Sequence, residues 1–385
     1  MIDIREAGWL TPERVRGYAV LLCLASLGLL VDAWLKATGP VGSDFLAFWG
    51  AGQVTAGGHP ALAYDLDVQE RVQLATGSQG WFAYVNPPPF LFIVAPFGML
   101  PFPLAWIAWV AGTYALWAWA AIRAFPRYWL PVLAFPGALI AAGHAQNGLL
   151  TGALLVGGVA LLDRRPLLAG ALLGALIIKP HLALLIPFWL AAGGRWKAFA
   201  AAGCSAVGLL ALSWAAFGTA TMQAYMTSWE VSSVIMQVAD ADFYLRLSTF
   251  YGQLSLFMPS SVALAVQVAL AAAMLGLTVI SWRRFGQDGM ATGALMLACT
   301  AIASPYLFNY DLPFLILPVM WLVLRGQAEG WRHWEKLAVI ALYFAPYATR
   351  AAALPLGINL MPLAAALLVW LIWTRGGKPR QDQYS

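Results

Sequence analysis

The segment GSDFLAFWGAG, residues 42–52, carries one acid, Asp44, just after the first apolar stretch long enough to cross a membrane. An aspartate that precedes an apolar helix commonly accepts hydrogen bonds from the first turn of that helix. A carboxylate can also act as a general base, taking a proton from a hydroxyl group as its oxygen attacks an electrophile. The local pattern favours the capping role and leaves the catalytic role open.

A lysine, Lys179, stands in the apolar segment GALLGALIIKPHLALLIP, and no other charged residue occurs between Arg165 and Arg195. An ionisable group at membrane depth costs free energy and usually has a function. Together with His181, its ammonium suits an anionic ligand, above all a phosphate at the membrane interface. The alternative is a lysine whose stem snorkels to water.

Other polar side chains interrupt the apolar stretches at their tips, as in GHAQN (143–147) and SPYLFNYD (304–311). They can satisfy the backbone of tight turns, or they can bind a sugar. Aromatic faces stack on pyranose rings, and amides and carboxylates form hydrogen bonds with hydroxyl groups. The candidate substrate-binding residues are Asn86, His144, Gln146, Asn147, Tyr306, Asn309, Tyr310 and Asp311.

The composition indicates that these residues belong to a membrane protein. The chain of 385 residues is 61% hydrophobic and 10% charged, with a mean hydropathy of +0.73. Soluble domains carry about 25% charged residues, so we expect a polytopic membrane protein. Long apolar runs such as 263–282 predict helices, because in hydrocarbon each backbone polar group must be satisfied within its own segment. The net charge of +5 comes without a basic stripe that has interleaved aromatic residues, so no nucleic-acid partner is expected.

Three cysteines, Cys23, Cys204 and Cys299, lie far apart inside apolar runs. We therefore expect neither a disulfide nor a metal site from them.

Basic residues collect on the cytoplasmic side of bacterial membranes, so Arg5, Arg14 and Arg16 place the N-terminus inside. Later basic groups fit about twelve crossings with both termini inside. The expected spans are 18–35, 103–122, 128–142, 148–162, 166–178, 181–192, 198–217, 259–281, 289–304, 311–324, 337–349 and 355–373. Segments 88–100 and 166–192 fit this scheme least well.

This topology puts the polar tips on the outer side of one membrane domain, residues 1–385. Two long outer loops are expected, 36–101 and 219–257, and Arg246 and Arg350 become outer cations. Either arginine could complete a phosphate site or simply lie at the level of the lipid headgroups. In the first loop, Phe45, Phe48 and Trp49 recur at helical spacing, which predicts an amphipathic helix on the membrane surface. We assign Asp65 and Asp67, which follow in this loop, to capping and solvation.

An ordered set of motifs resembles glycosyltransferase family 87 of the GT-C superfamily. The set is GSDFLAFWGAGQ, a following Tyr-Asp, a Pro-Pro helix start, a G-x-x-N tip and AGALLGALIIKPHLALLIP. The resemblance covers most of 40–200 and continues more weakly to about 325. The pair Lys179-Pro180 matches well. Asn86 stands where the family has an aromatic residue before Pro-Pro, and the tip at 143–147 departs from G-Q-x-N. These departures concern the donor and the acceptor more than the reaction.

The resemblance implies a GT-C-type bundle and an inverting hexosyltransferase of the bacterial inner membrane, with its site facing the periplasm. Asp44 is similar to the general base of that superfamily. The donor would be a sugar, such as mannose, linked to polyprenyl phosphate, and the acceptor a lipid or a glycan. Cations would stabilise the leaving phosphate, and no divalent metal would be needed. The candidate phosphate-binding residues are Lys179, His181, Arg246 and Arg350.

The alternative function is a transporter or a glycolipid flippase. Such a protein is expected to show internal repeats, with charged residues near the bilayer midplane in corresponding halves. No repeat is visible in the sequence, and its polar groups gather on one side. A sugar ligase or another GT-C-like transferase is a further possibility within the enzyme class.

Overall fold

The computed structural model describes residues 4–237 and 240–376 of the chain. It is 79% helical, and its described part contains no strand beyond an isolated bridge between Leu247 and Phe308. Within these described residues, six helices are long and apolar enough to cross a membrane, and several shorter apolar helices accompany them. The prediction of an all-α polytopic membrane protein is confirmed.

The helices fall into three groups by length and composition. The long apolar ones are α1 (Pro12–Ala37), α5 (Phe102–Ala124), α11 (Trp196–Gln237), α14 (Ser260–Phe285), η7 with α16 (Asn309–Leu315 and Ile316–Glu329) and α17 (Glu335–Leu356). The shorter apolar ones are η3 with α4 (Pro88–Phe90 and Leu91–Gly98), α8 (Gly148–Leu161), α9 with η5 (Pro166–Gly174 and Ala175–Ile178), η6 with α10 (Pro180–Ala183 and Ile186–Ala192), α15 (Gly289–Ala303) and α18 (Met361–Arg375). The remaining elements are η1 (Ile4–Glu6), α2 (Phe45–Ala56), η2 (Pro60–Tyr64), α3 (Leu66–Leu74), η4 (Pro126–Tyr128), α6 (Trp129–Leu133), α7 (Pro136–His144), α12 (Ala241–Arg246) and α13 (Phe250–Leu254).

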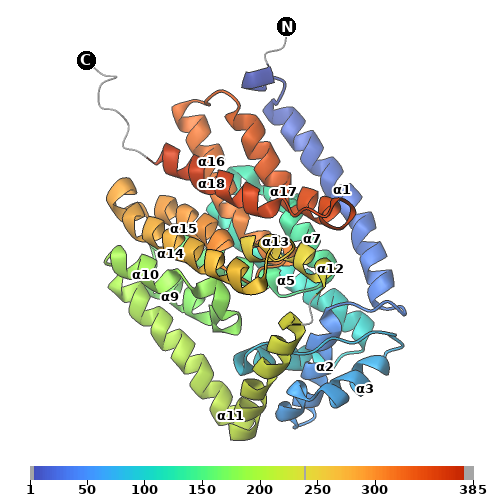
Figure 1. The fold of residues 1–385 in the computed structure, drawn as a ribbon. Coiled ribbons are helices and arrows are strands. Elements are labelled where there is room, and N and C mark those ends of the chain that lie inside the picture. Colours follow the sequence, from blue (N-terminus) through green and yellow to red (C-terminus); the bar gives the residue numbers. More distant parts are fainter. Residues whose placement is uncertain (1–3, 238–239, 377–385) are drawn as a thin grey trace, which may run out of the picture.

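The long helices divide into an outer and an inner set. The most apolar stretches of α1 and α11 are only 11% buried within the protein, and that of α14 is 22% buried. Helices that are apolar but not covered by protein are typical of membrane spans. In contrast, η7 with α16 is 72% buried, and nearly every residue of α15 is buried. Figure 1 shows α1 and α11 at opposite edges of the molecule, with α5, α7 and α15 between them.

The expected span at 128–142 is not one helix. α6 ends at Leu133, and α7 begins at Pro136. A proline cannot continue a helix and disfavours helical backbone at the residue before it. Phe135 is accordingly extended, with φ −63° and ψ 118°. The prediction of a continuous helix here is wrong for that reason.

The segment expected as a second loop, 219–257, is mostly helical. α11 continues past the predicted end at residue 217, with a kink at Gly218, whose φ is +78°. This positive φ is a conformation that glycine adopts without the steric cost of a side chain. α12 and α13 follow, while residues 238–239 lie outside the described part of the chain.

α2 is not an amphipathic surface helix, so this prediction is wrong. Phe45, Phe48 and Trp49 are all buried. The ring centroid of Phe48 lies 5.0 Å from that of Phe90, and the indole N–H of Trp49 donates a hydrogen bond of 2.9 Å to the carbonyl of Leu100. The aromatic residues therefore anchor α2 in protein rather than in lipid.

Candidate active site

α2 holds Asp44 at its N-terminal end, in a position fixed by close helix packing. α2 and α4 cross at two glycines, Gly52 and Gly98. A Cβ on Gly98 would lie 2.1 Å from the backbone carbonyl carbon of Gly52, and one on Gly52 would lie 2.3 Å from the carbonyl oxygen of Val94. Only glycine permits the two backbones to approach so closely.

The side chain of Asp44 does not cap α2. Asp44 already has helical backbone angles, φ −55° and ψ −23°, whereas a capping residue is normally extended. Its Oδ2 instead accepts a hydrogen bond of 3.3 Å from the side-chain amide of Gln146. Asp65 shows the contrast, because it is extended and accepts a hydrogen bond of 3.0 Å from the backbone N–H of Val68. The capping role belongs to Asp65, and the carboxylate of Asp44 is left for another task.

Asp44 opens into a cavity of about 680 Å³, which we call the Asp44 cavity. Every candidate site residue from the sequence except Asp311 lines it. Those residues are Asp44, Asn86, His144, Gln146, Asn147, Lys179, His181, Arg246, Tyr306, Asn309, Tyr310 and Arg350. Asp311 lies directly behind the wall and is completely buried. Segments that are far apart in the sequence thus meet in one site.

Lys179 forms a buried ion pair at the wall of the Asp44 cavity. Its ammonium contacts the Oδ1 of Asp311 and donates a hydrogen bond of 2.8 Å to the Oδ1 of Asn147. It also lies 5.3 Å from the ring centroid of Tyr310, within the range of a cation–π contact. The side chain of Lys179 is only 10% exposed. It does not snorkel to water, and its charge already has a partner.

The two arginines differ from Lys179. Arg246 and Arg350 are exposed, and neither forms an ion pair with the other described side chains. Burial lowers the pKa of His144, nearby Asp44 raises it, and Arg350 and Arg246 lower it further. His144 therefore lies within the fields of both arginines and of Asp44, and its imidazole is neutral at pH 7.

Two neighbouring side chains can form hydrogen bonds with a ligand without carrying charge. Burial, with Asp311 and Asp44 adding to it, raises the pKa of Tyr306 to about 12, so the hydroxyl keeps its proton. The imidazole of His181 packs edge-on against Tyr306, with ring centroids 5.8 Å apart. Its Nε2 is buried and has no hydrogen-bond partner among the described residues.

In the described part of the chain, no group of three or more His, Cys, Asp or Glu side chains is placed to hold a metal ion.

A comparison with known families shows to which family the chain belongs. The family model described as glycosyltransferase family 87 matches residues 84–305, more than half of the chain. The chain belongs to glycosyltransferase family 87. The match confirms the resemblance found in the sequence, and it decides for an enzyme over the transporter or flippase. No match was found among curated proteins or among solved structures.

The matched region of this family 87 glycosyltransferase includes only part of the Asp44 cavity. Asn86, His144, Gln146, Asn147, Lys179, His181 and Arg246 lie inside it. Asp44, Tyr306, Asn309, Tyr310, Asp311 and Arg350 lie outside it. The family match therefore supports the enzyme class, while the case for Asp44 rests on the geometry of the cavity.

The glycosyltransferase has an aromatic wall that the sequence reasoning missed. Tyr225 and Trp229 line the Asp44 cavity from α11, and Phe243 lines it from α12. Tyr225 and Trp229 are four residues apart and pack edge to face at 5.6 Å, so their helical spacing was a usable signal. Phe48 and Phe82 complete the apolar lining near Asp44.

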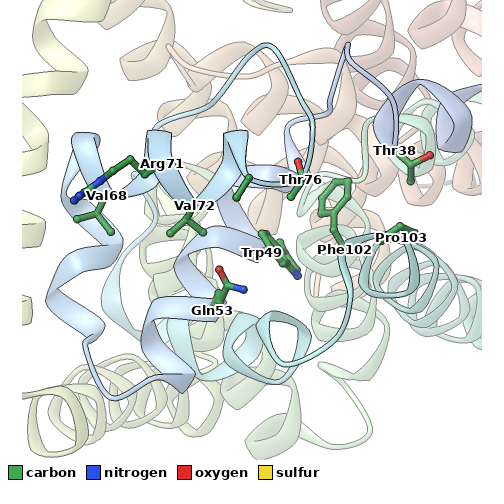
Figure 2. A pocket seen from close by; sticks show the side chains of 10 residues that line it. Thr38, Trp49, Gln53, Val68, Arg71, Val72, Thr76, Phe102 and Pro103 are labelled. Atoms are coloured by element: carbon green, nitrogen blue, oxygen red, sulfur yellow. The ribbon is translucent and has the colours of Figure 1, made fainter.

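Another face of α2 lines a second cavity of similar volume, about 680 Å³, which we call the α2–α3 groove. Figure 2 shows Trp49 and Gln53 of α2 beside Val68, Arg71 and Val72 of α3. No acid or histidine lines this groove. The Asp44 cavity therefore holds the carboxylate and the histidines that the α2–α3 groove lacks, although the two spaces are equally large.

Proposed function

We propose that this glycosyltransferase moves a hexose, such as mannose, from a polyprenyl-phosphate sugar to a lipid or glycan acceptor, with inversion at the anomeric carbon. The observation that carries the proposal is the charge pattern of the Asp44 cavity. One carboxylate, Asp44, shares this space with two arginines that have no carboxylate partner among the described side chains.

In the proposed reaction, Asp44 takes the proton of the acceptor hydroxyl while the hydroxyl oxygen bonds to the anomeric carbon. The bond between that carbon and the phosphate oxygen breaks, and its electron pair goes to the phosphate. Polyprenyl phosphate then leaves. Glycosidases need a second carboxyl group to protonate an alcohol leaving group. A phosphate leaves without that help, so one carboxylate is enough here.

The arginines fit the charge that develops on the leaving group. The donor is a phosphodiester with one negative charge, and the released monoester carries about −1.5 to −2 at pH 7. Arg246 and Arg350 supply two positive charges, so we assign them to the phosphate. Their guanidinium groups match phosphate oxygens in geometry. They stabilise the larger negative charge that develops on the leaving phosphate more than the single charge of the bound donor.

Neutral groups of the cavity are suited to the sugars. We assign Asn86, His144, Tyr306, Asn309 and Tyr310 to the hydroxyl groups and faces of the donor hexose or of the acceptor. His181 belongs to the same wall as Tyr306. Its unpartnered, buried Nε2 suits a hydroxyl group or a phosphate oxygen of the donor.

The apolar exterior of the bundle suits the lipid tail of the donor, which would lie between helices with its phosphate at the membrane interface. We propose the bacterial inner membrane as the location, with the Asp44 cavity facing the periplasm. The basic N-terminus supports this orientation. α2 and α3 lie at the end of the molecule opposite to both termini (Figure 1), as expected if the termini are cytoplasmic.

The donor class can be tested with the purified enzyme in lipid nanodiscs and a membrane lipid extract as acceptor. Polyprenyl-phosphate mannose and a nucleotide-diphosphate mannose are compared in the presence of EDTA. We expect transfer from the lipid-linked donor only, without loss of rate in EDTA, and a product of inverted anomeric configuration by NMR. Transfer from the nucleotide sugar, a requirement for added metal, or retained configuration would overturn the corresponding part of the proposal.

A further inference from the structure

We infer that Lys179 and Asp311 form a positioning pair that holds the hydrogen-bond partner of Asp44, and that Lys179 does not bind the donor phosphate. The inference rests on the proposed function. Its starting point is the burial of both partners. Counted over the whole residue, Asp311 is 0% exposed and Lys179 is 8% exposed. A buried ion pair is electrically balanced, so it adds little net attraction for a phosphate.

The pair is connected to Asp44 through the turn at 144–147. Lys179 holds the side chain of Asn147, whose backbone N–H donates a hydrogen bond of 3.4 Å to the Oε1 of Gln146. The amide nitrogen of Gln146 donates to Asp44. Three hydrogen bonds, joined through the covalent frames of Asn147 and Gln146, thus connect the buried ammonium to the proposed base.

This turn needs an external support. Ala145 has φ +50° and ψ 33°, in the left-handed region that residues other than glycine rarely adopt. Such a conformation persists only where surrounding structure holds it. The bond from Lys179 to Asn147 supplies that support two residues farther on, in the buried wall of the cavity.

Asp311 fixes the other side of the pair. Its Oδ2 accepts a hydrogen bond of 3.1 Å from the backbone N–H of Phe308, which closes the turn that carries Phe308 and Tyr310. The start of α8 packs directly on this turn, since a Cβ on Gly148 would lie 1.7 Å from the carbonyl oxygen of Tyr310. The pair thus locks together two turns that each present residues to the Asp44 cavity.

The same contacts argue against a phosphate on Lys179. A phosphate there would lie beside the carboxylate of Asp311, which is buried and cannot turn toward water. Arg246 and Arg350 offer exposed charges in the same cavity without that repulsion.

The test is a double-variant cycle with polyprenyl-phosphate mannose as donor, using Lys179→Gln, Asp311→Asn and the two changes combined. Each single change leaves a buried charge without its partner, which displaces Gln146. We expect kcat to fall about 100-fold in each single variant, with donor KM unchanged. The combined variant has no unpaired charge and keeps amide hydrogen bonds, so kcat should recover by about tenfold, again with the donor KM of the wild type.

Direct phosphate binding by Lys179 would give another pattern and would overturn the inference. Asp311→Asn would free the ammonium and lower donor KM, whereas Lys179→Gln and the combined variant would both raise it. If a single variant does not fold, the donor KM of the combined variant still distinguishes the positioning role of Lys179 from direct phosphate binding. The exposed pair Lys36–Asp32 on α1 is the matched control, and its neutralisation should leave both kinetic constants unchanged.

Hydrogen exchange in the absence of substrate separates this inference from the proposed function. We expect faster exchange of the backbone amides at 144–149 in the single variants than in the wild type or in the combined variant. Unchanged exchange in the single variants would contradict the positioning role. If wild-type enzyme does not use the lipid-linked donor, the proposed function fails on its own, and the exchange experiment still tests the pair.

Discussion

At the scale of single residues, the chemistry of the Asp44 cavity depends on which charges are already paired. The sequence reasoning placed Lys179 first among the cations for the phosphate, and named Arg246 and Arg350 as further cations that could complete the site. In the structure, Lys179 is paired with Asp311, while Arg246 and Arg350 are exposed within the cavity. Breaking a buried ion pair costs about 3–5 kcal/mol, so a loss of activity in a Lys179 variant alone does not show that the lysine binds substrate.

The two arginines give a prediction at this scale. Replacing either Arg246 or Arg350 by glutamine removes one charged hydrogen-bond donor to the phosphate. We expect donor KM to rise by about tenfold or more for each variant, since such a bond contributes about 1.5–3 kcal/mol. Steady-state kinetics with varied donor concentration measure it.

Arg71→Gln is the control for this prediction, because Arg71 lines the α2–α3 groove and not the Asp44 cavity. Its donor KM should equal that of the wild type. An unchanged donor KM in both arginine variants would show that the phosphate binds elsewhere.

At the scale of elements, the position of Asp44 depends on the crossing of α2 and α4. α2 has few polar residues, and its aromatic side chains pack against α5 and against Phe90 at the end of η3. Its apolar pattern did not distinguish burial in protein from burial in lipid, because both environments select the same residue types. The close contact between Gly52 and Gly98 shows that α2 packs against protein. This contact joins two separate segments, so the sequence of α2 alone could not predict it.

The crossing can be tested with Gly98→Ala. The added methyl group would lie 2.1 Å from the backbone nitrogen of Gln53, so α2 must move. We expect a loss of about 1–3 kcal/mol in the free energy of unfolding, seen as a lower melting temperature in detergent, and a lower kcat.

Gly112→Ala is the matched control, since nothing lies within 4 Å of the added Cβ in the middle of α5. Alanine favours a helix over glycine, so this variant should be at least as stable as the wild type. Equal stability of the two variants would contradict the close crossing.

Residue rarity explains which site residues could be predicted. Charged and amide side chains are few in this apolar chain, so Asp44, Lys179 and Asn147 stood out by type alone. Aromatic residues are common, with 19 Trp, 13 Tyr and 19 Phe, so Tyr225 and Trp229 did not stand out. The pairing of Lys179 with Asp311 joins positions 132 residues apart, and only the folded chain reveals it.

At the scale of the whole molecule, the sequence predicts basic loops on one side of the membrane and the chemically capable side chains on the other. The basic N-terminus and the polar tips were assigned to opposite sides of the membrane from charge alone. α2 and α3 do lie far from both termini (Figure 1). Which of these two ends faces the periplasm is still a prediction.

Cysteine labelling tests the orientation. In a variant without Cys23, Cys204 and Cys299, one new cysteine is placed at His59 or at Gln287, both of which are exposed. We expect a membrane-impermeant thiol reagent to label position 59 in intact cells, because it belongs to the outer loop. Position 287 should react only after the cells are opened. The reverse pattern would place the Asp44 cavity on the cytoplasmic side.

The central claim is that Asp44 is the base of a glycosyl transfer to a membrane-associated acceptor. The most direct measurement is mass spectrometry of membrane glycolipids and glycans from cells that lack this protein, complemented with the wild type, Asp44→Asn or Asp67→Asn. Asp67 is exposed on α3, and its variant serves as the matched control. We predict that wild type and Asp67→Asn restore a species larger by one hexose, and that Asp44→Asn is produced and folded but does not restore it. Restoration of this species by Asp44→Asn would contradict the account.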